Sequence, residues 1–345
     1  MSVQVETSTD APAGWDAYVR QHAAASAYHL SAAVRIARDA FGLHVFFLTA
    51  KDAAGNVIGL LPLVEQSSAL LGRYLISVPY FTYGGALAND DSVATKLCLA
   101  AGELGRSRRA AHVELRHTLP IEGLPFGARL DKVSMVLPLP ATEEALSKQL
   151  GSKLRSQIKR AEREQVEVAW GEAELLPGFY SVFAPTMHEL GTPVYSKRFF
   201  ETVLQALPGL ARVLVVKSQG RVEAAAIVVR HTSRLEVPWA ACTPEGKRKS
   251  INMRLYWEML RFAVGSGAPA FDFGRSSVDA GTYKFKAQWG SQPMQLHWHY
   301  WMAGDAPLPK LNHSNPKFAL AANLWRRMPL WCANLIGPHI ARNLP

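Results

Sequence analysis

Residues 212–231 read RVLVVKSQGRVEAAAIVVRH, and residues 46–64 read FFLTAKDAAGNVIGLLPLV. In each stretch two apolar runs flank a turn, which is centred on Gly220 in the first and on Gly55 and Asn56 in the second. Two apolar runs separated by a short glycine-containing turn are typical of a β-hairpin. The sequence therefore predicts the same hairpin in both halves of the chain.

The elements that follow each hairpin also recur at a nearly fixed offset. Residues 78–80 (VPY) match residues 237–239 (VPW), 159 positions later. Self-similarity at a long, constant offset indicates a duplicated domain. We expect an α/β (α+β) fold with two similar domains, residues 1–140 and 141–304, and a tail at 305–345. The later matching elements are helical patterns at 91–109 and 250–264, then short strands at 112–116 and 271–275.

Composition and charge limit the class of protein. Hydrophobic residues make up 48% of the 345-residue chain and charged residues 19%, which is typical of a globular protein with a sizeable core. The three cysteines are widely spaced, which excludes a disulfide scaffold and fits a reducing compartment. The formal net charge of +10 favours anionic partners such as nucleic acid, anionic lipid or phosphorylated precursors.

Targeting signals and membrane-spanning segments are not evident in the sequence. Residues 1–12 have neither the basic nor the apolar region of a secretory signal. No uncharged apolar stretch reaches the roughly 18 residues that a spanning helix needs. We therefore expect a cytoplasmic protein.

The tail has an unusual composition. After Asp305 it has no acidic residue, and Trp325 and Trp331 lie among its basic residues. Basic and aromatic residues together suit a helix that lies at the surface of the inner membrane, which would make the protein peripheral there. The alternative is a helix packed on the body with its arginines solvated. The five basic residues are Lys310, Lys317, Arg326, Arg327 and Arg342.

A long amphipathic helix is predicted at 142–164. Its positive face predicts contact with phosphate groups, and an ordinary solvated face is the alternative. The apolar stripe recurs every three or four residues, at Leu146, Leu150, Leu154, Ile158 and Ala161. The basic side chains, called the basic ridge below, are Lys148, Lys153, Arg155, Lys159, Arg160 and Arg163.

A second anion site is predicted where a strand at 235–240 leads into CTPEGKRKSIN (242–252). Ser250 is placed to cap the helix that follows, and the free amides at a helix start attract anions. Lys249 and Asn252 are therefore candidates to bind an anionic group, and Lys247 and Arg248 add charge beside them. An exposed basic turn is the alternative.

The stretch FDFGRSSVDAGTYKFKAQWG (271–290) begins as a strand. Alternate residues of a strand face opposite sides, so Asp272 faces away from its two phenylalanine neighbours. A carboxylate in a buried strand must be paired or functional, because burying it alone is costly. The same alternation further along puts Lys284 and Lys286 on one face and Tyr283 on the other.

These side chains supply groups that acyl transfer to an amine requires. The reaction needs a group that takes or orients the amine proton, a group that stabilises the oxyanion, and a group that neutralises the leaving group. A structural ion pair between Asp272 and Arg275, with two surface lysines, is the alternative. The candidate catalytic residues are Asp272, Arg275, Lys284 and Lys286.

Turn and aromatic residues elsewhere are candidates to line a substrate pocket. His297 and His299 share a strand face, but no third ligand is evident, so no metal site is expected. The pocket candidates are Tyr80, Tyr83 and Gly85 in the first half, and Tyr195, Trp239 and Tyr283 in the second.

The doubled unit and its ordered motifs resemble the FemAB-like proteins. The tail MPLWCANLIGPHIARNLP (328–345) is similar to the branch of that family associated with exosortase (PEP-CTERM) and exopolysaccharide loci. The resemblance implies two tandem GNAT-like acyltransferase domains, with mixed, mostly antiparallel sheets flanked by helices, and a C-terminal helical tail. The motifs are KLRSQIKRAER (153–163), GTPVYSKRFF (191–200), FDFGRSS (271–277) and GTYKFKAQWG (281–290).

The resemblance also implies an activity. In the better-known Fem relatives, aminoacyl-tRNA donates an amino acid to an amine of a peptidoglycan precursor. We therefore expect an N-acyl or aminoacyl transferase that uses an anionic donor, needs no bound cofactor, and acts on an amine-bearing saccharide or peptide precursor of the cell envelope or of an exopolysaccharide.

The nature of the donor is open between tRNA and a phosphopantetheine carrier. Acetyl-CoA-dependent GNAT enzymes hold pyrophosphate with the pattern [QR]-x-x-G-x-[GA]. Aligned on Gly246, this chain has Thr243 at the first position and Arg248 at the last, which disfavours a conventional CoA site. The alternatives are an N-acyltransferase dependent on acyl-CoA or acyl-carrier protein, and a non-catalytic binder of an anionic saccharide precursor.

Overall fold

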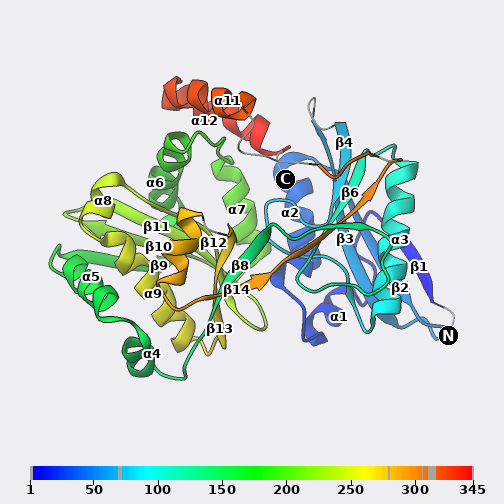
Figure 1. Ribbon diagram of the computed structural model, residues 1–345, viewed down its shortest axis with the longest axis horizontal. Coiled ribbons are helices and arrows are strands. Elements are labelled where there is room, and N and C mark those ends of the chain that lie inside the picture. The colour runs from blue at the N-terminus through cyan, green and yellow to red at the C-terminus, as the bar shows by residue number, and fades with distance from the viewer. Residues whose placement is uncertain (1–2, 69–71, 279, 305, 310–315, 344–345) are drawn as a thin grey trace.

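Two β-sheets, one in each half of the molecule, carry the helices on their faces (Figure 1). A computed structural model describes residues 3–68, 72–278, 280–304, 306–309 and 316–343. The fold is mixed α/β with mostly antiparallel sheets and a helical tail, as the sequence predicts.

The first sheet has the strand order β1-β2-β3-β4-β6-β15-β7, with β5 paired to β3. Helix α3 crosses over between β4 and β6, and α1, η1 and α2 precede β2. The strands are β1 (Gln4–Ser8), β2 (Val45–Lys51), β3 (Val57–Ser68), β4 (Gly72–Ile76), β5 (Leu87–Ala88), β6 (His112–His117), β7 (Gly127–Arg129) and β15 (His297–Met302). The helices are α1 (Trp15–Gln21), η1 (Ala27–His29), α2 (Ser31–Phe41) and α3 (Asp91–Ser107).

The second sheet has the order β14-β8-β13-β12-β11-β10-β9. Helices α8 and α9 cross over between β12 and β13, and α6 and α7 precede β10. The strands are β8 (Lys132–Pro138), β9 (Val166–Gly171), β10 (Ala211–Ser218), β11 (Arg221–Arg230), β12 (Leu235–Cys242), β13 (Ala270–Ser277) and β14 (Gln292–Gln295). The helices are α4 (Glu143–Gln149), α5 (Ser152–Glu162), η2 (Ala173–Leu175), α6 (Leu176–Glu189), α7 (Lys197–Ala206), α8 (Pro244–Arg248), α9 (Ile251–Gly265) and α10 (Gly281–Ala287).

Both predicted hairpins are present, as β2–β3 and β10–β11. Gln219 and Gly220 at the second turn both have positive φ, +51° and +75°. Two consecutive positive φ angles give a turn whose twist matches that of the flanking strands, which explains the glycine there. The predicted order of hairpin, strand, helix and strand occurs twice.

In each half the strand after the hairpin pairs only briefly with its parallel neighbour. Strands β4 and β6 are paired at Leu75–Val113 and Ile76–Glu114, and β12 and β13 at Leu235–Phe271 and Glu236–Asp272. Beyond these two residue pairs the strands separate. The separation opens one end of each sheet between two adjacent strands.

The two halves exchange a strand. β8 follows the first half in sequence, yet it lies between β13 and β14 in the second sheet. β15 follows the second half, yet it lies between β6 and β7 in the first sheet. Each sheet therefore contains a strand from the other side of the predicted domain boundary at residue 140. The boundary itself stays a prediction.

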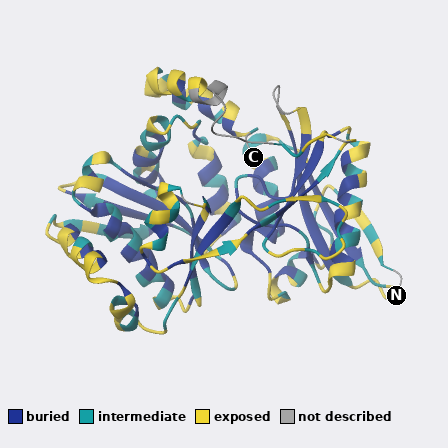
Figure 2. Ribbon diagram, viewed as in Figure 1, coloured by how far each residue is buried: buried dark blue, intermediate teal, exposed yellow. Residues whose placement is uncertain are grey.

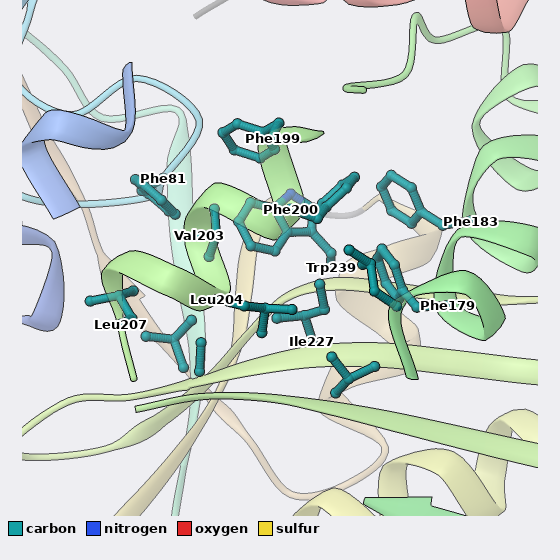
Figure 3. Close-up of a cluster of buried hydrophobic side chains, with 14 of the residues drawn as sticks. Phe81, Phe179, Phe183, Phe199, Phe200, Val203, Leu204, Leu207, Ile227 and Trp239 are labelled. Carbon is teal, nitrogen blue, oxygen red and sulfur yellow. The ribbon is translucent and has the colours of Figure 1, made fainter. Parts of the chain in front are cut away.

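The interface between the halves is a hydrophobic core in its own right. Phe199 and Phe200 of α7 pack against Trp239 of β12, with ring centroids 5.6 and 5.3 Å from the indole (Figure 3). Phe81 of the first half reaches the same indole and stacks on Tyr28 with centroids 4.0 Å apart. Burial of large aromatic rings from both halves favours one fixed arrangement.

The predicted long helix at 142–164 is wrong in one respect, because it is two helices. Leu150 and Gly151 are both extended, with ψ of 135° and 155°, so the chain leaves the helical conformation between α4 and α5. The predicted apolar stripe from Leu146 to Ala161 is buried, while the outer faces of both helices are exposed (Figure 2).

The tail forms α11 (Pro316–Arg327) and α12 (Leu330–Ala341), which lie against α6 (Figure 1). The Nε and Nη2 atoms of Arg326 donate hydrogen bonds to the carbonyls of Glu189 and Leu190. Within the described part of the chain, none of the helices is long and apolar enough to cross a membrane.

The exchange of strands predicts that neither half folds alone. A fragment of residues 1–140 would lack β15, and a fragment of 141–345 would lack β8, so each would expose an unpaired sheet edge that promotes aggregation. Expressed separately, both fragments should be insoluble or show no cooperative thermal transition, whereas co-expression should give a soluble complex. A cooperative transition in either isolated fragment would contradict this expectation.

Candidate functional site

The separated ends of β12 and β13 hold a buried lysine. The Nζ atom of Lys286 donates hydrogen bonds of 2.9 Å to the carbonyls of Gly274 and Arg275 on β13. Gly274 has a φ of +77° at an irregularity of the β13–β8 pairing, which turns these carbonyls toward the lysine. Burial lowers the pKa of Lys286 to about 8, against the raising effect of nearby Asp272 and Glu236.

The second lysine of the motif lies elsewhere. The prediction that residues 283–288 form a strand is wrong, because α10 is a helix, and residues two apart on a helix face different directions. Lys284 is exposed, whereas Lys286 is buried and Tyr283 is partly buried against the second core. Residues 281–287 form only one or two helical turns. In so short a stretch, the spacing of apolar residues does not distinguish a helix from a strand.

Asp272 is closed to solvent and fully bonded on one oxygen. Its Oδ1 accepts hydrogen bonds from the Ser134 hydroxyl at 2.5 Å and from the Gly274 amide at 2.8 Å. Its Oδ2 lies 3.5 Å from Nη1 of Arg234. The predicted alternative of an Asp272–Arg275 ion pair is therefore wrong about the partner. Burial and the negative charge of Glu236 raise the pKa of Asp272.

The sequence reasoning missed Glu236, which pairs with Asp272 across the last two parallel residues. Its Oε2 accepts hydrogen bonds from the Tyr28 hydroxyl at 2.7 Å and from His231 Nε2 at 3.0 Å. The Ala27 amide donates to His231 Nδ1, so the ring proton is on Nε2. Burial would raise the pKa of Glu236, but the bonds from His231 and Tyr28 lower it. A glutamate within the apolar strand LEVPWAAC was the available signal.

Two arginines meet at Trp298 of β15. The guanidinium carbons of Arg116 and Arg275 lie 4.4 and 5.4 Å from its ring centre. Arg116 is buried and bonded to Glu114 and to the Phe81 carbonyl. Arg275 is open to solvent, although the surrounding protein and the charge of Arg116 lower its pKa. The Arg275 guanidinium thus reaches solvent while protein surrounds much of it. Such a group is suited to bind an anion that enters between the halves.

A pocket of about 250 Å³ lies between the halves, on the side of Tyr83 and Gly85. His231 and Arg234 line it from the second half. The Gly85 amide donates to the Arg116 carbonyl at 2.8 Å, so it does not offer a hydrogen bond to a substrate. A larger hollow of about 530 Å³ over α3 contains none of the predicted site residues.

Tyr80 and Tyr195 come together, with ring centroids 5.4 Å apart. Tyr80 has a φ of +74°, a strained conformation for a residue with a side chain, and its hydroxyl donates to the Arg342 carbonyl at 2.7 Å. Both tyrosines therefore lie beside the C-terminal end of α12. Trp239, by contrast, is enclosed in the core between the halves.

The predicted anion site at 242–252 is built differently from the expectation. Thr243 caps the short helix α8 by accepting from the Gly246 amide, while Ser250 has a φ of +64° and its side chain caps nothing, so its predicted capping role is wrong. Glu245 lies within 3.4 Å of the Lys249 ammonium and also pairs with Arg248. Asn252, in the first turn of α9, is partly buried.

The basic ridge is exposed along its whole length. Among the described residues, no carboxylate forms an ion pair with Lys153, Arg155 or Lys159. Nη1 of Arg155 donates to the Leu150 carbonyl at 2.5 Å and so closes the end of α4. Both interpretations of the ridge, phosphate contact and plain solvation, fit this geometry.

The two histidines of β15 do not form a pair. His299 Nδ1 lies 3.0 Å from Nδ1 of His117 on β6, and the Ala86 amide donates to His117 Nε2. His117 therefore carries its proton on Nδ1 and donates it to His299. Across the residues that the structure describes, no three metal-binding side chains converge.

Comparisons with known proteins agree with this geometry. Residues 148–287 match a family model described as an acetyltransferase (GNAT) domain, and this segment contains Glu236, Asp272 and Lys286. By sequence, no curated protein matches the chain.

Solved structures show the fold of the whole molecule. FemX is similar with a TM-score of 0.68 and 14% identity, over 92% of this chain and 100% of FemX. The C-terminal domain of a putative lysylphosphatidylglycerol synthetase from Agrobacterium fabrum has a TM-score of 0.58 and 15% identity, over 90% of this chain and 94% of that one. A tandem GNAT protein from the clavulanic acid pathway has a TM-score of 0.54 and 11% identity, over 89% and 100%. The chain therefore has a tandem GNAT fold.

Lys286 makes stability depend on pH in a defined direction. Its pKa is about 8 in the folded chain, against an ordinary value of 10.5. Between these values the unfolded chain binds more protons, so the free energy of unfolding rises with pH across this window. Below about pH 8 both states are charged and the contribution is constant.

Denaturant unfolding at pH 7.5 and 9.5 measures this effect. Wild type and Lys284→Met should both gain stability from Lys286 at the higher pH, whereas Lys286→Met should lack that gain. Equal changes in all three proteins would mean that Lys286 has an ordinary pKa.

Proposed function

We propose that the protein is an N-acyl or aminoacyl transferase that acts on an amine of a cell-envelope or exopolysaccharide precursor, as the resemblance to FemAB-like proteins implies. The observation that carries the proposal is Lys286, a buried lysine held at the open end of β12 and β13 within the GNAT-matched segment. The fold supports the general class of acyltransferase. The acceptor and its pathway go beyond the fold and are part of the proposal.

The proposed chemistry is attack of the acceptor amine on the donor's ester or thioester carbon. The carbon–nitrogen bond forms, the carbonyl oxygen becomes an oxyanion, and the alcohol or thiol then departs with a proton. A charged lysine has three N–H donors, and Lys286 uses two of them on Gly274 and Arg275. The third is proposed to stabilise the oxyanion, in a site where few waters compete.

Asp272 is proposed to act through Lys286. Because its carboxylate is closed to solvent, the amine proton leaves by way of the substrate or water, and Asp272 helps to keep Lys286 charged. Arg275, whose main-chain carbonyl accepts from Lys286, has an exposed side chain, and we assign it to the anionic part of the donor or acceptor.

The donor is proposed to be anionic, either aminoacyl-tRNA or a phosphopantetheine carrier, with the basic ridge as its contact surface. The loop that holds pyrophosphate in CoA-dependent relatives is closed here, because the Gly246 amide donates to the Thr243 hydroxyl and the amides of Lys247 and Lys249 donate to main-chain carbonyls. This observation favours tRNA over CoA. Lys249 and Asn252 extend the ridge toward α9.

The acceptor is proposed to enter between the halves, where Tyr83 and Gly85 line the pocket and Tyr80 and Tyr195 form a second aromatic edge. An amine-bearing saccharide or peptide precursor is the proposed class. The proposed location is the cytoplasm, with access to precursors at the inner membrane. The alternative of a non-catalytic binder predicts no turnover with any donor.

Variants at the two buried charges separate the roles. Lys286→Met should lower turnover about 100- to 1,000-fold, the usual effect of losing one oxyanion donor, whereas exposed Lys284→Met should lose far less. Asp272→Asn removes a charge that raises the pKa of Lys286, so the fall of activity at alkaline pH should move to lower pH.

Turnover per folded molecule is measured with aminoacyl-tRNA or acyl-CoA as donor and a glucosamine-type amine as acceptor. A loss of roughly 100- to 10,000-fold in Asp272→Asn at every pH would identify it as a direct base instead. Normal turnover in Lys286→Met would end the proposal for that lysine.

The basic ridge predicts salt-dependent donor binding. Neutralising Lys148, Arg155 and Lys159 to glutamine should weaken tRNA binding and reduce the slope of log K against log salt by roughly two to three units. The matched control neutralises three cations elsewhere, Arg20, Lys96 and Arg221, and so changes the net charge equally. Identical slopes in the two variants would leave the ridge a solvated surface.

A further inference from the structure

The two tail helices expose large apolar side chains. Trp331 and Leu335 of α12 are 71% and 66% exposed, and Leu320 and Leu324 of α11 are 61% and 60% exposed. Ile336 and Ile340 add to the outer side of α12. Scattered apolar residues on a surface are ordinary, but a helix whose exposed residues are apolar apart from one histidine, His339, is not.

The inner face of α12 is built from small residues. Ala333, Gly337 and Ala341 are the buried residues of this helix. A Cβ atom on Gly337 would lie 3.1 Å from the amide nitrogen of Val194, so the helix approaches the body closely. A helix that packs only on its own protein normally buries its large apolar residues, and α12 has the opposite arrangement. The large apolar side chains on the outer face of α12 therefore remain exposed instead of packing on the body.

The charge around this face indicates the kind of partner. Arg326 and Arg327 end α11 and Arg342 follows α12, and residues 306–345 contain no acidic residue. A second copy of the chain would bring like charges together, whereas an anionic bilayer offers both opposite charge and apolar depth. Two helices of 12 residues are too short to span a bilayer but suit its interface.

The tail is hydrogen-bonded to both halves of the molecule. The apolar face of α11 and α12 therefore has a fixed orientation relative to the body. The main-chain carbonyls of Arg342 and Asn343 accept hydrogen bonds from Gln66 and Tyr74 of the first half, at 2.7 and 2.9 Å. Arg326 holds the other end to the second half through carbonyls at the end of α6. The apolar face thus belongs to a preformed surface and needs no folding when it meets a partner.

We propose that the α11–α12 pair docks on an anionic lipid bilayer, with Leu320, Leu324, Trp331, Leu335, Ile336 and Ile340 in the headgroup and upper acyl region. Binding of this kind adds apolar burial to attraction between arginine and lipid headgroups. The proposal does not rest on the transferase activity. Its consequence for the site is that Tyr80 and the segment around Tyr195 lie beneath the docked helix, because the Tyr80 hydroxyl donates to the Arg342 carbonyl and Gly337 lies against Val194.

Vesicle co-sedimentation of the full chain tests the proposal. Wild type should bind vesicles that contain 30% phosphatidylglycerol, a composition chosen at roughly the anionic content that such surfaces require, and bind neutral phosphatidylcholine vesicles at least about tenfold more weakly. Trp331→Ser/Leu335→Ser should bind the anionic vesicles about tenfold more weakly than wild type. The control Leu99→Ser/Leu130→Ser removes exposed apolar residues outside the tail and should bind like wild type.

A label at Cys332 gives a second measurement that leaves the apolar face intact. Cys98 and Cys242 are buried, so a polarity-sensitive dye attaches selectively at Cys332, and its emission should shift to the blue with anionic vesicles. Absence of vesicle binding, equal binding by the tail variant, or an unshifted dye would overturn the proposal. Sedimentation velocity that shows a dimer of wild type but a monomer of the tail variant would assign the face to a second copy instead.

Discussion

The separation of β12 from β13 determines which groups must lie beside these strands. Where the strands part, main-chain carbonyl groups face a space that water does not freely fill, so these carbonyls need other partners. In this chain a lysine ammonium occupies that space and bonds to two of the carbonyls. Glu236 and Asp272 are paired in register beside this space, so Lys286 and Arg234 lie near two buried carboxylates. Each of these groups would be costly alone; burial lowers the pKa of Lys286 to about 8, and the two carboxylates oppose that fall.

The first half of the chain supplies hydrogen-bond partners to the buried charged groups of the second half. Tyr28, from the short helix η1, bonds to Glu236, and the Ala27 amide fixes the tautomer of His231. Charged side chains of the second half therefore depend on main-chain and side-chain groups of the first. The aromatic core around Trp239 holds the two surfaces in the register that these bonds need. A displacement of one half would leave buried polar groups unpaired, which favours a single relative position.

Much of the fold could be predicted from local patterns. The hairpins around Gly55 and Gly220, the repeated strand–helix–strand and the helical tail all follow from periodicity and turn chemistry. Glu236 was also visible, since the rule applied to Asp272 fits it equally. The helix at 281–287 was too short for its period to be read, and the break at Gly151 needed the conformation of Leu150. The exchange of β8 and β15 depends on pairing between distant strands, which no local pattern records.

That exchange has a consequence for biosynthesis. As the ribosome releases the chain from the amino terminus, the first sheet has β1 to β6 available early but must wait for β15, one of the last strands to be made. Until then the edge of β6 is open, and the apolar strand β8 has no sheet to join because β13 has not yet emerged. Unpaired strand edges are therefore exposed through most of translation, and both sheets close almost together at its end.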